Sequence, residues 1–173
     1  FEMAYRIYKI KFIRQHNLII FKIKSYLCFT MIKFIDLDFV EISKPKLKIL
    51  LRKVASEKQY IINRVEYNFI NANKMKEINK EFLDHDEITD IITFDYTEGS
   101  KISAEVFISK EALLNNAAEN RQSAEDETVR LVLHGLLHCL GYKDKTKSEK
   151  EIMRGKEEEG IKMFHVKQMT LDV

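Results

Sequence analysis

Hydrophobic and polar positions between residues 31 and 173 follow two periods, one typical of strands and one typical of helices. Segments that alternate, or are rich in β-branched and aromatic residues, predict four strands, at 32–40, 64–70, 91–96 and 102–109. Apolar residues three and four positions apart predict five helices, starting near Pro45, Asn71 or Asn73, Lys110, Ser123 and Lys147. The helices alternate with strands early and cluster late. We therefore expect one α+β domain with a four-stranded mixed sheet.

Two helix boundaries in the C-terminal half are marked by specific residues. Gly141 follows an apolar helix predicted over 123–140 and suits the left-handed conformation in which helices commonly end. Thr146 and Glu149 have the spacing of a capping box, which predicts a last helix over about 147–164. We interpret the charged residues of that last helix as a solvated face, comprising Lys150, Glu151, Glu157 and Glu158.

Composition supports a folded globular protein. Apolar residues make up 45% and charged residues 32% of the 173, with five glycines and one proline. Collagen-like, low-complexity and intrinsically disordered classes are excluded by this balance, and the length suits a single domain. Two cysteines, Cys28 and Cys139, are too few for a disulfide scaffold. We expect Cys139 to be a core thiol in a reducing compartment.

The charge is distributed unevenly along the chain. The formal net charge is +2, but residues 1–30 hold six basic residues and one acid, which leaves 23 basic and 26 acidic residues in 31–173. Bulk charge therefore gives no sign of a general nucleic-acid binder. We expect 1–30 to be a basic N-terminal extension outside the fold and 31–173 to be the domain. Basic residues interrupt every apolar run of the extension, so we expect a cytoplasmic protein with no membrane partner.

The candidate chemistry lies in the stretch from His134 to Asp144. His134 and His138 are four residues apart on a helix, so their side chains project about 40° from each other and both can reach one ion. Gly141 allows the chain to turn back, and Asp144 can then bring a carboxylate to the same ion. Two nitrogens and one carboxylate suit a single Zn²⁺ with an open position for water, although other divalent metals are possible.

The residue after the first histidine argues against peptidase chemistry. The helix and exit turn resemble those of metzincin peptidases, in which a glutamate directly follows the first histidine and acts as general base. Here that position is Gly135, which can transfer no proton. The general base is left open between a distant carboxylate, Lys143 and the metal centre itself.

Three blocks of sequence, in the same order, resemble the YbeY family of bacterial endoribonucleases. His134 to Asp144 is similar to the family's His-Gly-x-Leu-His-x-x-Gly-Tyr core with its third ligand. Asn79 to Phe94 is similar to the loop-and-strand segment that contains an Asp-x-x-Thr-Asp motif, and Ile102 to Ser109 is similar to the following strand. The resemblance covers about residues 31–165.

The resemblance implies a metal-dependent, single-strand-specific endoribonuclease. It would act in rRNA maturation, at the 3′ end of 16S rRNA, and in ribosome quality control, with rRNA and the small ribosomal subunit with its proteins as partners. His134, His138 and Asp144 would be the catalytic and metal-ligating residues, and Asp86 and Thr89 match the family's loop as substrate contacts. Two other classes stay open: a metal-dependent hydrolase with a different substrate, and a non-catalytic ribosome-assembly factor with a structural metal.

Two positions depart from the family pattern. The third ligand is Asp144 where histidine is commoner, which should keep the site and alter its metal preference. Leu83 stands where the family usually has an arginine thought to bind substrate phosphate. Arg130, one helical turn before His134, and Lys143 beside Asp144 are candidates for the missing cation. The alternatives are that Arg130 pairs with Glu127 or Asp126 and that Lys143, with Lys145 and Lys147, is simply solvated.

Overall fold

The structure is a computed structural model that describes residues 30–83 and 89–166. The described residues form a four-stranded mixed sheet and five helices, which confirms the predicted α+β fold. The elements are β1 (Met31–Ile35), α2 (Lys44–Glu57), β2 (Ile61–Ile70), α3 (Ala72–Leu83), β3 (Ile91–Asp95), β4 (Lys101–Ser109), α4 (Lys110–Glu119), α5 (Ala124–Cys139) and α6 (Lys147–His165). The extension expected over 1–30 lies, except for Thr30, outside the described residues and stays a prediction.

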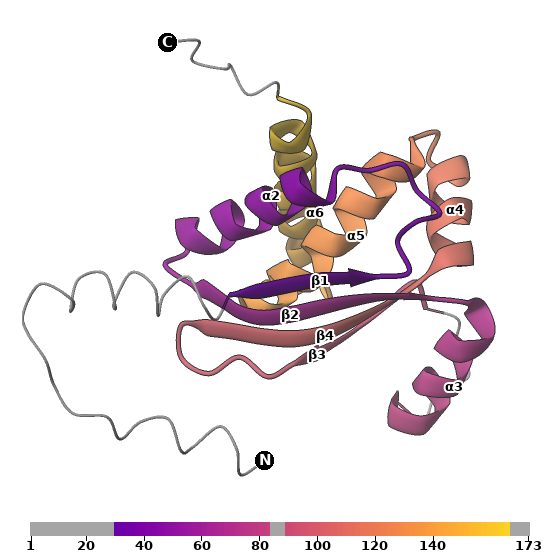
Figure 1. Ribbon diagram of the computed structural model, residues 1–173, viewed down its shortest axis with the longest axis horizontal. Helices are drawn as coiled ribbons and strands as arrows, with labels where there is room; N and C mark the ends of the chain where they lie inside the picture. The colour runs from indigo at the N-terminus through magenta and orange to yellow at the C-terminus, as the bar shows by residue number, and fades with distance from the viewer. Residues whose placement is uncertain (1–29, 84–88, 167–173) are drawn as a thin grey trace, which may run out of the picture. The chain divides into compact units, whose positions relative to one another are not determined.

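The sheet has the strand order β1-β2-β4-β3 (Figure 1). β1, β2 and β4 are parallel, and β3 pairs antiparallel with β4. β1 is shorter than the strand predicted over 32–40. It ends at Ile35 because Asp36 takes a left-handed conformation with φ of 58°, which turns the chain away from the sheet.

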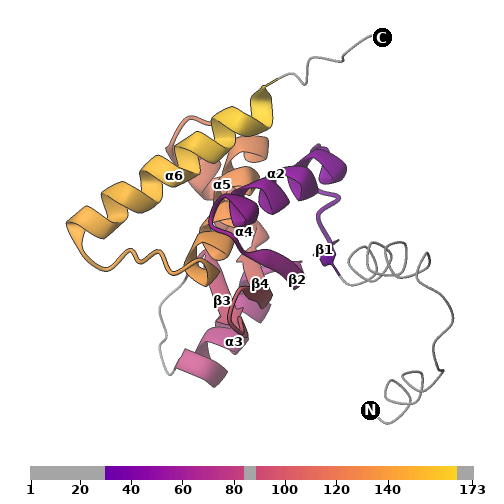
Figure 2. The same cartoon turned by 90° about the vertical axis from the view of Figure 1, so that its left-hand side faces the viewer.

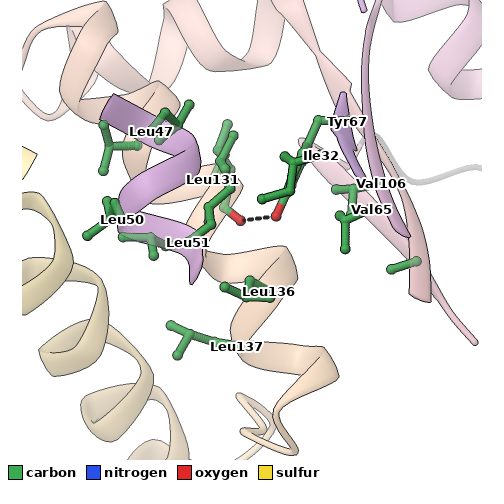
Figure 3. Packing of buried hydrophobic residues seen from close by; sticks show 14 of the residues in the cluster. Ile32, Leu47, Leu50, Leu51, Val65, Tyr67, Val106, Leu131, Leu136 and Leu137 are labelled. Carbon is green, nitrogen blue, oxygen red and sulfur yellow. Dashed lines mark hydrogen bonds between the residues drawn. The ribbon is translucent and has the colours of Figure 1, made fainter. Parts of the chain in front are cut away.

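The two faces of the sheet are covered unequally. Alternate residues of β2 and β4 enter the main core with α2 and α5, namely Val65, Tyr67, Phe69, Ala104, Val106 and Ile108 (Figure 3). The opposite face holds a smaller cluster in which Met75 and Ile78 of α3 pack with Ile92 of β3. The main layer of helices lies on one side of the sheet and α3 lies on the other (Figure 1).

Helix α5 is the central helix of the main layer, and a hydrogen bond and close packing attach it to the sheet. The Tyr67 hydroxyl, fully buried, donates a hydrogen bond of 3.1 Å to the main-chain oxygen of Val132 (Figure 3). Gly135 lies so close to the sheet that an added Cβ would lie 3.1 Å from Val106 Cγ1 and 3.2 Å from Thr93 Oγ1. These contacts fix the distance of α5 from the sheet and the rotation of the helix about its own axis relative to β2, β3 and β4.

Helix α6 runs antiparallel to α5, because His165 at its end pairs with Asp126 near the start of α5 while Glu157 pairs with His134 near the end of α5. Figure 2 shows α6 along the outside of the helix layer. Its N-terminus has the predicted capping box: the Thr146 hydroxyl accepts from the Glu149 backbone, and the Glu149 carboxylate accepts from the Thr146 backbone. Gly160 packs directly on Leu133 of α5. Among the helices of 30–83 and 89–166, none is long and apolar enough to cross a membrane.

Candidate metal centre

The last turns of α5 bring His134 and His138 together. Their Nε2 atoms are 2.9 Å apart, and their rings are nearly perpendicular, with centroids 4.5 Å apart. The His134 side chain is 13% exposed and the His138 side chain 31%. The i, i+4 spacing therefore does what was predicted: it directs two imidazole nitrogens at one point near the surface.

The exit from α5 returns the chain to that point. Gly141 has φ of 86°, its N–H donates to the His138 carbonyl at 2.9 Å, and the Tyr142 N–H donates to the Leu137 carbonyl at 3.0 Å. These two bonds form a Schellman motif, which requires a left-handed residue and therefore favours glycine. Asp144 follows, with Oδ2 at 3.6 Å from Nε2 of His134 and 3.9 Å from Nε2 of His138. The three predicted ligands are thus gathered in one group.

The hydrogen bonds on the far side of each ring determine which nitrogen carries the proton. Nδ1 of His138 lies 3.1 Å from the Tyr142 carbonyl oxygen, and Nδ1 of His134 lies 2.6 Å from Glu157 Oε1. Both partners only accept, so each Nδ1 is the donor and each neutral ring presents an unprotonated Nε2 to the centre. When both rings are neutral, two nitrogen lone pairs and a carboxylate oxygen therefore face one another. This set of acceptors fits a cation.

The sequence-based interpretation of Glu157 is wrong. It was expected on a solvated face of α6, but it is 6% exposed and its carboxylate holds His134. The sequence did contain a signal for this. The buried residues of α6 recur at the spacing of one helical face, and Glu157 is among them, with Met153, Gly160 and Phe164.

Arg130 is surrounded by carboxylates. It donates to Glu127 at 2.6 and 2.7 Å, approaches Asp90 at 3.3 Å, and has Nη1 3.8 Å from Glu157 Oε2. Burial lowers the pKa of its guanidinium, but these carboxylates outweigh burial, and the pKa lies above its ordinary value. The predicted alternative, pairing with Glu127, is confirmed. A contact between Arg130 and substrate stays a prediction.

The position of Gly135, where metzincin peptidases have a glutamate, faces the sheet in this protein and leaves little room for a side chain. The Cβ of any larger residue would be pressed against Val106 and Thr93. Cys139 is buried as predicted, and its thiol donates to the Gly135 carbonyl at 3.4 Å. This side of α5 is structural.

The other residues predicted to contact substrate are Thr89, Lys143 and Asp86. Thr89 donates from its hydroxyl to the Ile91 carbonyl at 3.1 Å, which supports the chain entering β3. Lys143 is exposed on the loop beside Asp144. Asp86, the neighbouring His85 and the side chain of Leu83 lie outside the described residues.

Comparisons with known proteins place the chain in one family. The family model described as "Endoribonuclease YbeY" matches residues 32–165. A Flavobacterium johnsoniae protein named Endoribonuclease YbeY is 47% identical over 104 residues, covering 60% of this chain and 75% of that protein. One from Christiangramia forsetii with the same name is 37% identical over 135 residues, covering 78% of this chain and 94% of its own.

A solution structure of a Thermotoga maritima protein has a similar fold. It superposes with a TM-score of 0.51 at 24% sequence identity and covers 78% of this chain and 89% of its own. The family model spans the sheet except for Met31, the group formed by His134, His138 and Asp144, and the whole of α6. The chain belongs to the YbeY family.

Proposed function

We propose that this protein is a metal-dependent endoribonuclease that cleaves single-stranded rRNA during rRNA maturation. The observation that carries the metal part is the convergence of three potential ligand atoms, Nε2 of His134, Nε2 of His138 and Oδ2 of Asp144. The ribonuclease part is supported by the names of its relatives. A divalent ion held there, which we propose to be Zn²⁺, supplies Lewis acidity for attack on a phosphodiester.

The exposure of the three residues favours a catalytic site over a structural one. Structural zinc sites are closed by four protein ligands, whereas catalytic sites keep a position open. Within the described residues the group has three members, and the Asp144 side chain is 41% exposed. His134 and His138 are held from behind, so the open side faces solvent, where an RNA strand can approach.

The cellular role follows from the same proposal. We propose rRNA and the small ribosomal subunit as partners, the cytoplasm as location, and rRNA 3′-end maturation and ribosome quality control as processes. The domain from 31 to 173 is mildly acidic overall. Its intrinsic affinity for RNA should therefore be weak, with specificity supplied by the ribosome or a protein partner.

The test compares wild-type protein with Asp144→Ala and with Asp144→His. Elemental analysis of the purified proteins should find about one metal ion in the wild type, much less in Asp144→Ala, and restored content in Asp144→His. Cleavage of a single-stranded rRNA fragment should follow metal content. Glu119→Ala, exposed at the end of α4, is the matched control and should behave as wild type.

The outcomes separate the alternatives. Folded wild-type protein that binds no divalent ion contradicts the metal assignment. Metal bound without RNA cleavage, combined with unfolding on metal removal, points to an assembly factor with a structural ion. Hydrolysis of another phosphoester or an amide, but not of RNA, points to a different substrate.

A further inference from the structure

A cavity of about 440 Å³ lies between the metal centre and α6. Its walls include the ligands His134 and Asp144 and the side of α6 that carries Met153 and Glu157. The first half of α6 also contributes three cations to this cavity, Lys147, Lys150 and Arg154. The helix that was expected to be merely solvated therefore forms one wall of the candidate active site.

The three cations form a single row. They are three and four residues apart, so their side chains project from one face of α6. At 1.5 Å per residue the row extends about 10 Å along the helix, which is longer than a single anion requires. All three are exposed, and no ion pair joins any of them to a carboxylate of the part of the chain that the structure describes. By contrast, Arg130 is already shared among three carboxylates.

The carboxylates in the cavity do not cancel this row once a metal is bound. The cavity walls include Asp144, Glu151 and Glu157. Glu157 is committed to His134 and Arg130, and Asp144 would be a ligand of the ion. Glu151 then remains to oppose the three cations, and a divalent ion ligated by Asp144 adds one net positive charge. The loaded cavity is therefore suited to an anion with several charges.

Part of the backbone around the start of α6 is already hydrogen-bonded within the chain. The Glu149 carboxylate already accepts from the N–H groups of Lys145 and Thr146, at 3.1 and 2.8 Å. The cationic side chains that line the cavity, those of Lys147, Lys150 and Arg154, are the groups suited to bind an anion there. Because such contacts act through charge, they should bind phosphates without reading bases.

We propose that Lys147, Lys150 and Arg154 bind successive phosphates of a single-stranded RNA beside the bond to be cleaved. This inference rests on the proposed function. The row would align the strand along α6, so that one phosphodiester lies over the open side of His134, His138 and Asp144. It would supply cationic contacts in a chain that has Leu83 where the resemblance to the family predicts an arginine.

The experiment measures RNA binding by the metal-loaded full chain as a function of salt. Lys150→Gln with Arg154→Gln removes two cations of the row. Lys156→Gln with Lys162→Gln removes the same charge from the same helix outside the cavity. Each phosphate contact with a single strand contributes about 0.7 to the slope of log K against log salt, so the first variant should lose about 1.4 from the slope. The control should keep nearly the wild-type slope, and both should keep the wild-type metal content.

The results distinguish this inference from the proposed function. If the wild type cleaves RNA and the two variants have the same slope, the row is not the binding site and the proposed function stands. If the row variant alone loses slope while the wild type binds RNA without cleaving it, the binding site stands and the endoribonuclease proposal fails. If the loaded wild type binds no single-stranded RNA, both fail.

Discussion

Nδ1 of His134 donates a hydrogen bond to Oε1 of Glu157, with the two atoms 2.6 Å apart. This bond joins the last turns of α5 to the middle of α6, and Glu157 is also 3.8 Å from the guanidinium of Arg130. A carboxylate behind a metal-binding imidazole fixes its tautomer and raises its basicity. Helix α6 therefore orients His134 through Glu157, and it also lines the cavity next to His134 and Asp144.

Replacing Glu157 should weaken metal binding. Glu157→Ala removes the acceptor for His134 Nδ1, and loss of such a partner typically costs 10- to 100-fold in metal affinity. Glu157→Gln should recover part of this loss, because its amide oxygen can still accept from Nδ1. Isothermal titration of the metal-free protein with Zn²⁺ measures the effect.

The matched control for Glu157 is its exposed neighbour, Glu158→Ala, which should keep wild-type affinity. Circular dichroism of both variants checks that α6 still forms. Equal Zn²⁺ affinity in Glu157→Ala and Glu158→Ala would show that Glu157 does not position His134.

Two glycines of α6 should respond to alanine with opposite signs. At Gly160 the added Cβ would clash with the buried Leu133 side chain, and overpacking of this kind costs about 1–3 kcal/mol. At Gly155 nothing lies within 4 Å of the added Cβ, so alanine should stabilise the helix by about 0.5–1 kcal/mol. Urea unfolding of both variants measures the difference. Stabilisation by Gly160→Ala would contradict the close packing of α6 on α5.

Removing the buried hydroxyl of Tyr67 should destabilise the domain modestly. Tyr67→Phe keeps the ring in the core and loses only the hydrogen bond to Val132, worth about 0.5–1.5 kcal/mol. The control is Tyr96→Phe, since Tyr96 is 56% exposed. A stability loss of the same size in both variants would rule out a specific contribution from the bond between β2 and α5.

Cys139 should be almost unreactive in the folded protein. Burial, with a smaller contribution from Asp95, raises the pKa of its thiol to about 12, and only the thiolate reacts. At pH 8 the thiolate fraction would be about 10⁻⁴, whereas an ordinary thiol with a pKa of about 8.5 would be about one-quarter ionised. Reactivity should rise as pH approaches 12.

The Cys139 measurement uses a Cys28→Ser variant and a chromogenic disulfide reagent. Slow labelling that becomes fast in denaturant is the expected result. Labelling of the native protein at the rate of a free thiol would mean that this side of α5 is open to solvent.

The parts that sequence predicted well are those governed by local chemistry. The spacing from His134 through Gly141 to Asp144 lies within one helix and its exit, so helix geometry and one left-handed residue suffice to bring the ligands together. The capping box of α6 was equally local. The strand predicted to Val40 failed beyond Ile35 because the left-handed backbone at Asp36 turns the chain out of the sheet.

By itself, the amino-acid sequence determined the α+β element order, the candidate metal-ligand set and the family resemblance, since each depends on residues that are close together in the chain. Only the tertiary structure decided what α6 does. Its packing on α5 buries Glu157 behind His134 and places Lys147, Lys150 and Arg154 along the cavity. From sequence alone, the charged residues of α6 are expected to be solvated. Only the packing of α6 on α5 shows whether each charge faces water, a histidine or the cavity.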